Sequence, residues 1–145
     1  MADVTPPTPM ERIFNKLAGL TLALGLGPAH MFVLQVRGRK TGRVYSTPVD
    51  VLVLGGRRYL VAPRGHTSWA RNALATGSVT LSRGRRREEC RVRALAASET
   101  APVLKAYLDA FTLAVQRYFP VPAGSPEAAF VPLADRYPVF ELSPR

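Results

Sequence analysis

The sequence predicts a mainly β domain of the α+β type, a six-stranded antiparallel barrel with helices packed outside it. Its 145 residues suit one domain, and an apolar fraction of 47% is enough for a packed core. Apolar and alternating runs follow in the order helix, three strands, short helix, two strands, long helix, short helix, strand. Glycine-bearing turns between neighbouring strands indicate antiparallel pairing. We therefore expect residues 9–145 to form a single domain and residues 1–8 to form a flexible tail.

An apolar helix is expected at the start of this domain. Thr8 suits the N-cap, Pro9 suits the first turn, and Glu11 completes a capping box. Gly25 and Pro28 are typical of a helix end. We expect the helix to pack on the rest of the domain.

The apolar stretch 17–29 has three other interpretations to be considered. It is shorter than the roughly 20 apolar residues that a transmembrane helix needs. Asp3 and Glu11 cancel the positive charges that a signal peptide needs at its start. Peripheral contact with a membrane, or with a lipidic substrate, is the remaining alternative for a helix this apolar.

Three strands then form a predicted meander. Residues 31–37 alternate like a half-buried strand, and 44–54 end in a continuous apolar run. The pair Gly55-Gly56 predicts a hairpin whose return strand is 57–62. A basic turn at 38–42 joins the first two strands.

The second half of the chain carries the same kinds of signals. Thr67 and Ser98 are suitable N-caps, and Gly77 and Gly84 mark a helix end and a hairpin turn. The remaining predicted elements are a short helix at 68–75, strands at 78–83 and 85–95, a long helix at 99–118, a short helix at 127–135 and a strand at 137–142.

Composition narrows the partners and the compartment. Twenty Lys and Arg against ten Asp and Glu give a net charge of +10, which favours anionic partners such as phosphorylated small molecules, acidic membranes or nucleic acid. The Arg-rich, Ala-rich usage is similar to that of GC-rich, actinobacterial-like genomes. The one cysteine, Cys90, cannot form an internal disulfide, so we expect a cytoplasmic protein and a buried or edge-strand thiol.

Two loops could hold an anion. The turn 37–43 (RGRKTGR) places four cations and a threonine beside two glycines, although on spacing alone a solvated hairpin tip is the better explanation. The segment 62–72 (APRGHTSWARN) leads from a strand into a helix N-terminus, whose free N–H groups attract negative charge. Trp69 and Asn72 share one face of that helix and could border a flat heterocycle.

Other catalytic motifs are missing from the sequence. It has no P-loop, no GxGxxG, no GxSxG and no zinc-ligand spacing, so we expect no metal. His66 follows Gly65 beside the second loop and could contact a ligand. A general-base role for His66 would need a partner that the sequence does not show, and His30 is the other histidine.

The run 36–48 (VRGRKTGRVYSTP) resembles the G-R-K-[ST]-G and T-P signature of the deazaflavin (F420)-dependent nitroreductase family. The run 59–74 (YLVAPRGHTSWARNAL) is similar to that family's S-K-G loop followed by W-x-x-N-L. The resemblance covers about 31–95 and implies the split β-barrel of FMN-binding oxidases. It also implies F420 as cofactor. The residues it assigns to cofactor binding are Arg39, Lys40, Thr41, Arg43, Thr47, Pro48, Pro63, Arg64, Gly65, His66, Ser68, Trp69 and Asn72.

Two departures from the family pattern affect this assignment. Pro63 replaces the serine of the S-K-G loop, which removes a hydroxyl and a backbone N–H, and puts nitroimidazole-type activation in doubt. Arg64 replaces the lysine, which keeps the charge and changes the geometry.

The resemblance implies hydride transfer from reduced F420 to a small electrophile such as a quinone, a nitroaromatic or an enone. We expect residues 121–133 to line the acceptor side, and the barrel type favours a homodimer. The candidate proton donors or substrate contacts are Tyr45, Tyr107, Tyr118 and Tyr137.

Two alternatives remain open, and a third is disfavoured. The same barrel could bind FMN, whose single phosphate needs fewer cations. It could also hold a cofactor or lipid without turnover. Binding of nucleic acid through the hairpin 83–87 is disfavoured because no aromatic lies between its arginines and Glu88 and Glu89 interrupt the charge.

Overall fold

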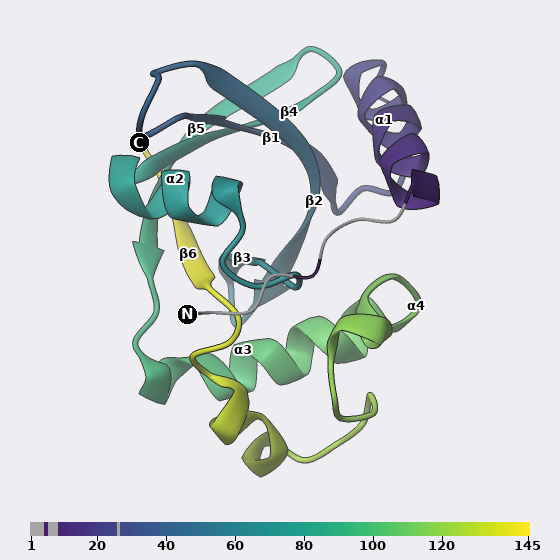
Figure 1. Ribbon diagram of the computed structural model, residues 1–145, viewed down its shortest axis with the longest axis vertical. Coiled ribbons are helices and arrows are strands. Elements are labelled where there is room, and N and C mark those ends of the chain that lie inside the picture. Colours follow the sequence, from purple (N-terminus) through teal and green to yellow (C-terminus); the bar gives the residue numbers. More distant parts are fainter. Residues whose placement is uncertain (1–4, 6–8, 26) are drawn as a thin grey trace.

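The computed structural model describes residues 5, 9–25 and 27–145. Six antiparallel strands close into a barrel in the order β1-β2-β3-β6-β5-β4, as Figure 1 shows. The predicted fold class is therefore confirmed. The strands are β1 (Met31–Arg37), β2 (Val44–Leu54), β3 (Arg57–Val61), β4 (Ser78–Arg83), β5 (Arg86–Ala94) and β6 (Val139–Pro144).

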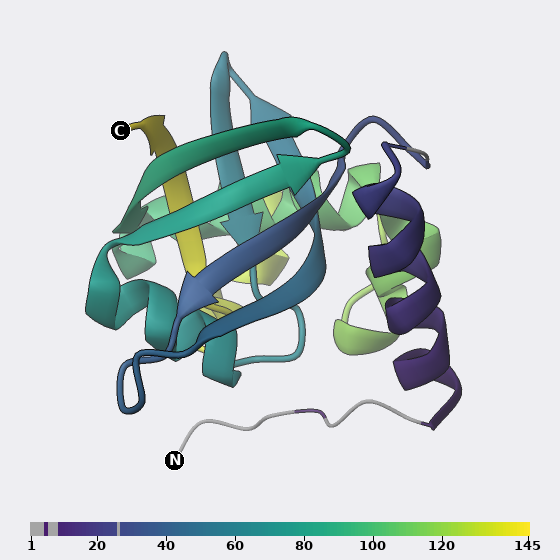
Figure 2. The same ribbon diagram turned by 90° about the horizontal axis from the view of Figure 1, so that it is seen from above.

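Helices surround the barrel on separate sides. In Figures 1 and 2, α1 stands on one flank beside the β4–β5 turn, while α3 and α4 lie across another face. The helix α2 covers one end of the barrel. The helical segments are α1 (Pro9–Ala23), α2 (Ser68–Thr76), α3 (Ala97–Ala110), α4 (Thr112–Val115) and the 3₁₀ turns η1 (Gln116–Tyr118) and η2 (Glu127–Leu133).

Local turn chemistry fixes the strand register. Gly55 and Gly56, between β2 and β3, have φ of 59° and 77°, the left-handed conformation that a two-residue hairpin turn requires.

The pairing of β1 with β2 places Met31 opposite Asp50 and Arg37 opposite Val44. The predicted bounds of both strands are confirmed by this pairing.

The hydrophobic core has two parts that share the barrel wall. Inside the barrel, Leu34, Leu60 and Cys90 are fully buried. Between the barrel and α3, Leu104 and Phe130 are fully buried in the second cluster. Removal of such large apolar side chains from water is the main stabilising contribution to a domain of this size.

Helix α1 is packed on one side only. Its connection to β1 approaches the β4–β5 turn so closely that a Cβ at Gly84 would lie 3.0 Å from the Gly25 Cα. On its outer face, Ile13, Leu20 and Leu24 remain 63–69% exposed. No helix in the described part of the chain is long and apolar enough to cross a membrane. Thr8, which was predicted as the N-cap, and most of the expected tail lie outside the described residues.

The helix predicted at 99–118 is wrong at both ends. It begins at Ala97, with Ala96 as N-cap, because the Glu99 carboxylate accepts the Ala96 N–H at 2.9 Å. It stops at Ala110, and Phe111 leaves the helical region at φ −120°, ψ 34°. The Phe111 and Tyr107 rings pack with their centroids 5.3 Å apart. Tertiary packing therefore ends the helix here, although the apolar pattern of the sequence continues.

The last strand begins two residues later than predicted. Tyr137 is 3% exposed and packs in the second core cluster, where its hydroxyl donates to the Tyr118 carbonyl. Pro138 has no N–H for a strand ladder, and its carbonyl accepts the Ala62 N–H at 2.9 Å. Strand β6 therefore starts at Val139.

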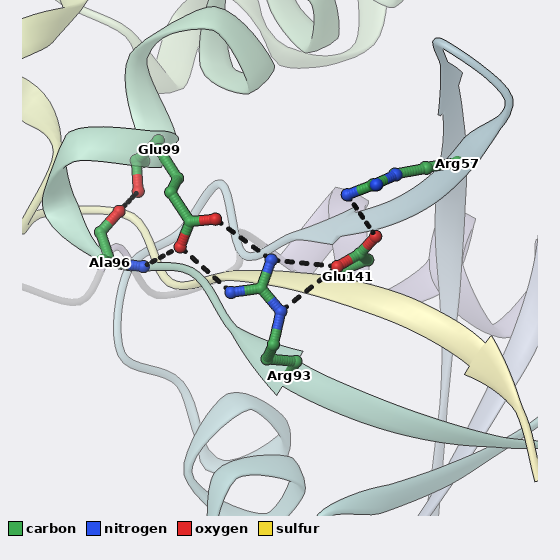
Figure 3. A network of polar contacts seen from close by, with 6 residues as sticks. Arg57, Arg93, Ala96, Glu99 and Glu141 are labelled. Atoms are coloured by element: carbon green, nitrogen blue, oxygen red, sulfur yellow. Dashed lines mark hydrogen bonds and ion pairs between the residues drawn. The ribbon is translucent and has the colours of Figure 1, made fainter.

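An ion-pair network ties the barrel to α3 (Figure 3). The Arg93 guanidinium lies between Glu99 at 3.0 Å and Glu141 at 2.9 Å, and Arg57 also contacts Glu141 at 3.3 Å. These contacts join β3, β5 and β6 to the first turn of α3. Arg93 and Arg57 are more than half exposed, so the network contributes modestly to stability.

Candidate active site

A cavity of about 840 Å³ opens between the barrel wall, α1 and the segment 110–118. Its wall combines apolar and polar side chains, as small-molecule sites usually do. The residues predicted as ligand contacts that line it are Thr47, Pro48, Pro63, Arg64 and Trp69.

The loop after β3 presents Arg64 and Thr67 to this cavity. The Gly65 N–H donates to the Ala62 carbonyl at 3.1 Å, and Gly65 adopts φ 94°, which a side chain would make strained. The Thr67 N–H then donates to the Gly65 carbonyl at 2.8 Å. Glycine at 65 is therefore required for the tight reversal that aims this loop into the cavity.

Thr67 is the N-cap residue of α2, as predicted, but its hydroxyl makes no capping hydrogen bond. The side chain is 8% exposed, and its Oγ1 has no hydrogen-bond partner among the described residues. A buried hydroxyl without a partner costs roughly 1–3 kcal/mol. Because Thr67 lines the cavity, a bound ligand could supply the missing partner.

The basic turn between β1 and β2 holds its own shape. Gly38 N–H donates to the Arg43 carbonyl at 2.6 Å, and Gly42 N–H donates to the Gly38 carbonyl at 3.0 Å. The Arg37 guanidinium donates to the Gly42 carbonyl at 2.7 Å, and the Thr41 hydroxyl accepts the Arg43 N–H at 3.2 Å. The side chains of Arg39, Lys40 and Arg43 remain exposed. The turn therefore offers preorganised cations.

Asn72 connects this turn to α2. Its Oδ1 accepts the Arg39 backbone N–H at 3.0 Å and the Arg39 guanidinium at 2.7 Å. Asn72 is 3% exposed, so its amide fixes the turn and does not border the cavity. Trp69 lies one helical turn earlier and lines the cavity, with its ring 6.1 Å from that of Phe140. The helix thus spans from the cavity to the basic turn.

Other predicted contacts lie elsewhere. His66 Nε2 is 3.0 Å from the Asp135 carbonyl oxygen and lines a second cavity of about 310 Å³. Ser68 is exposed at the start of α2 and does not line the large cavity. The Arg64 Nε donates to the Thr5 carbonyl at 2.7 Å, so part of its donor capacity is already used.

Of the four candidate tyrosines, two line the cavity and two do not. Tyr107 and Tyr118 line the cavity. Tyr45 packs over the basic turn, where a Cβ at Gly38 would meet its ring at 2.8 Å. Tyr137 belongs to the core. Burial, and secondarily the charge of Asp50, raise the pKa of Tyr107, so this phenol stays neutral and is a weak acid.

The segment predicted to line the acceptor side, 121–133, does not line the large cavity, and residues 110–118 form that wall instead. The break at Phe111 turns residues 110–118 toward the cavity, whereas 121–133 do not line it. Phe130 from that segment is fully buried in the core instead. Periodicity could not show this, because the break depends on packing against another element.

Sequence reasoning also missed a histidine–carboxylate pair in the cavity. The His30 Nδ1 lies 2.9 Å from the Asp50 Oδ1, and both residues line the cavity. Desolvation raises the pKa of Asp50, and the interaction with His30 partly offsets this. In sequence, Asp50 interrupts an apolar strand run, which was the available signal for a buried carboxylate with a partner.

One protein family model and several solved structures are similar to this chain. A family model described as F420H(2)-dependent quinone reductase matches residues 10–117. A solved F420-H2 dependent reductase (FDR-A) is 19% identical, with 79% of this chain and 95% of that chain covered and a TM-score of 0.53. No curated protein matches the chain.

Two further solved structures share the fold. One, described as a domain-swapped dimer, is 19% identical over 94% of this chain and 100% of that chain, with a TM-score of 0.56. A heme storage protein from Vibrio cholerae is 10% identical over 80% of this chain and 82% of that chain, with a TM-score of 0.56. At these identities the likeness shows the fold alone.

Proposed function

The chain belongs to the F420H2-dependent quinone reductase family, and we propose that it binds F420 from the basic turn to the large cavity. It is an F420-dependent oxidoreductase, which decides between the deazaflavin and the FMN alternative. The observation that carries the binding proposal is the path along α2, from Trp69 in the cavity to Asn72 beneath the turn.

The basic turn suits the anionic end of the cofactor. Arg39, Lys40 and Arg43 are exposed cations on a turn that is fixed by its own hydrogen bonds. The cofactor carries a phosphate and an acidic tail, and charge-assisted hydrogen bonds to such groups are the strong ones. A turn that is already ordered loses little conformational freedom on binding.

The cavity suits the ring. Pro48 and Trp69 supply flat apolar surface, and the unpartnered Thr67 hydroxyl supplies a polar contact. When bound, the reduced deazaflavin supplies a hydride, and the protein orients the ring and excludes water.

The cavity wall around residues 110–118 is suited to contact a quinone, which would be the hydride acceptor. Tyr107, Phe111 and Leu113 give this wall of the cavity an apolar, partly aromatic surface. Leu113 is fully exposed, so its side chain lies in solvent at the rim. Nitroaromatics and enones share the flat electrophilic character of quinones and are proposed as further acceptors.

We also propose a membrane contact and a cellular compartment for this protein. The exposed apolar face of α1 would contact a membrane surface, where lipophilic quinones reside, and Arg12 and Lys16 beside it would favour anionic lipid. Flotation with anionic vesicles tests this, and equal binding to neutral vesicles or none to either would contradict it. The single buried thiol, Cys90, suits a reducing cytoplasm.

Tryptophan emission tests the cofactor site. Trp69 is the only tryptophan, so F420 in the cavity should quench its emission saturably after correction for absorption. Arg39→Ala and Lys40→Ala should each weaken binding, while Arg91→Ala, an exposed arginine on β5, should not. The rate at which a soluble quinone oxidises reduced F420 should likewise fall in Arg39→Ala and Lys40→Ala and stay unchanged in Arg91→Ala. Absence of quenching and of binding by dialysis would contradict the proposal.

A further inference from the structure

The His30–Asp50 pair brings together the residue before β1 and a residue of β2. His30 immediately precedes β1, and Asp50 lies opposite Met31 in the β1–β2 register. The Val51 N–H donates to the His30 carbonyl at 2.8 Å, which fixes the backbone beside the pair. The 2.9 Å contact between His30 Nδ1 and Asp50 Oδ1 therefore rests on ordered backbone at both ends.

The His30 ring is held with its other nitrogen available. Nδ1 is used by Asp50, and Nε2 has no hydrogen-bond partner in the described part of the chain. The Phe111 ring packs against the imidazole at a centroid distance of 4.7 Å. Arg83 donates to the carbonyls of Pro28 at 2.6 Å and Met31 at 3.1 Å, on either side of His30.

Solvent can reach the imidazole but hardly reaches the carboxylate. The His30 side chain is 43% exposed and the Asp50 side chain is 15% exposed. This arrangement lets the imidazole exchange protons with water, while the Asp50 carboxylate holds the ring in one tautomer and one orientation. The other titratable or charged groups lining the same cavity are Arg64, Tyr107, Arg117 and Tyr118.

We propose that His30 is the catalytic acid that protonates the reduced acceptor, with Asp50 as the residue that positions it. The inference rests on the proposed function, because it concerns the acceptor side of the same cavity. Transfer of one hydride reduces a quinone by two electrons and leaves a hydroquinone monoanion. The His30 Nε2–H bond breaks, an O–H bond forms on that oxyanion, and the imidazole becomes neutral.

The proton balance closes through solvent. The neutral imidazole regains a proton from water at its exposed edge, and solvent would take up the one proton that the cofactor loses besides its hydride. The sum is one quinone and one reduced cofactor giving one hydroquinone and one oxidised cofactor. Among the cavity tyrosines, burial makes the Tyr107 phenol a poorer donor than an imidazolium.

A phenolate tests this without the cofactor. 2,6-Dichlorophenolate stands in for the hydroquinone monoanion, and its methyl ether is the neutral control; both are titrated into the protein by calorimetry. His30→Gln should weaken phenolate binding about tenfold and leave the ether within about twofold, as loss of one charge-assisted hydrogen bond predicts. His66→Gln, at the other histidine, should change neither.

Asp50→Asn separates positioning from a structural role. It keeps the side-chain size and removes the charge that stabilises an imidazolium, so the alkaline fall in both phenolate affinity and turnover should move to lower pH. In the wild-type protein, the phenolate should bind about tenfold more tightly than its methyl ether, and equal affinities would contradict the proposal. This measurement needs no variant and remains valid if a substitution prevents folding.

The outcomes are distinguishable from failure of the proposed function. If Trp69 is not quenched by F420 in the wild-type protein, the cofactor proposal fails. If F420 binds normally and His30→Gln keeps wild-type turnover and phenolate affinity, the His30 inference fails. Equal loss of turnover in Asp50→Asn at every pH, without a shifted profile, would also overturn the role of Asp50.

Discussion

Asn72→Ala tests whether the basic turn is preorganised by α2. The substitution removes an acceptor that is 3% exposed and that binds both the backbone N–H and the guanidinium of Arg39. A neutral hydrogen bond contributes about 1 kcal/mol and a charged one about 1.5–3 kcal/mol. Because the Arg39 side chain is exposed, water replaces much of the second bond, so we expect a total loss of about 2 kcal/mol.

This loss predicts two measurable changes. A domain of this size should melt about 4–8 °C lower, since each kcal/mol corresponds to about 2–4 °C. Release of the turn should also weaken F420 binding about tenfold, because the turn must then be ordered on binding. Thermal unfolding followed by circular dichroism and titration of Trp69 emission measure the two effects.

Asn72→Asp is the matched control, because it keeps an acceptor oxygen toward Arg39 at the same position. It should bind F420 more tightly than Asn72→Ala does. If Asn72→Ala melts at lower temperature but binds F420 as the wild-type protein does, the turn is not part of the cofactor site. If neither property changes, the two hydrogen bonds contribute nothing and the reasoning from geometry is refuted.

Four further substitutions test the rest of the account. Gly38→Ala should destabilise the domain by about 1 kcal/mol and weaken F420 binding, because its Cβ would lie 2.8 Å from the Tyr45 ring; urea unfolding and Trp69 emission measure this. Phe130→Ala should cost about 3–5 kcal/mol in urea unfolding, since the ring is fully buried; a loss below 1 kcal/mol would contradict the second core. Arg83→Gln should lower quinone turnover while F420 affinity stays the same, because Arg83 holds the carbonyls beside His30. The ion pair with Arg93 lowers the pKa of Glu99 from 4.5 to about 2, so the stabilising contribution of this pair is complete above pH 4.5 and is lost as the pH falls toward 2. In Glu99→Gln, the free energy of unfolding should therefore fall less steeply over this acid range than in the wild-type protein.

The strands could be predicted because their signals are local. The glycine pair at 55–56 fixes a turn whatever the rest of the chain does, and alternation then fixes which side chains face the core. The basic turn was predictable as a cluster of cations for the same reason. Its rigidity was not, because Asn72 lies 33 residues from Arg39 and their contact depends on how α2 packs.

The missed features all depend on contacts between distant elements. His30 and Asp50 are 20 residues apart and meet only through the β1–β2 register. The helix break at Phe111 places a new wall on the cavity, although the sequence pattern runs on. Tyr137 reads as a strand residue by pattern but is held in the core by its hydroxyl and by stacking on Phe119 at 4.6 Å.

The central claim is that the basic turn and the cavity together bind one F420 molecule. Its most direct test compares the affinity of F420 with that of the deazaflavin ring lacking the phosphate and acidic tail, in the wild-type protein and in Lys40→Ala/Arg43→Ala. The account predicts that the wild-type protein prefers F420 by about 100-fold and that the double variant loses most of this preference with ring affinity unchanged. Equal wild-type affinity for both ligands, or an equal loss of both in the variant, would contradict it.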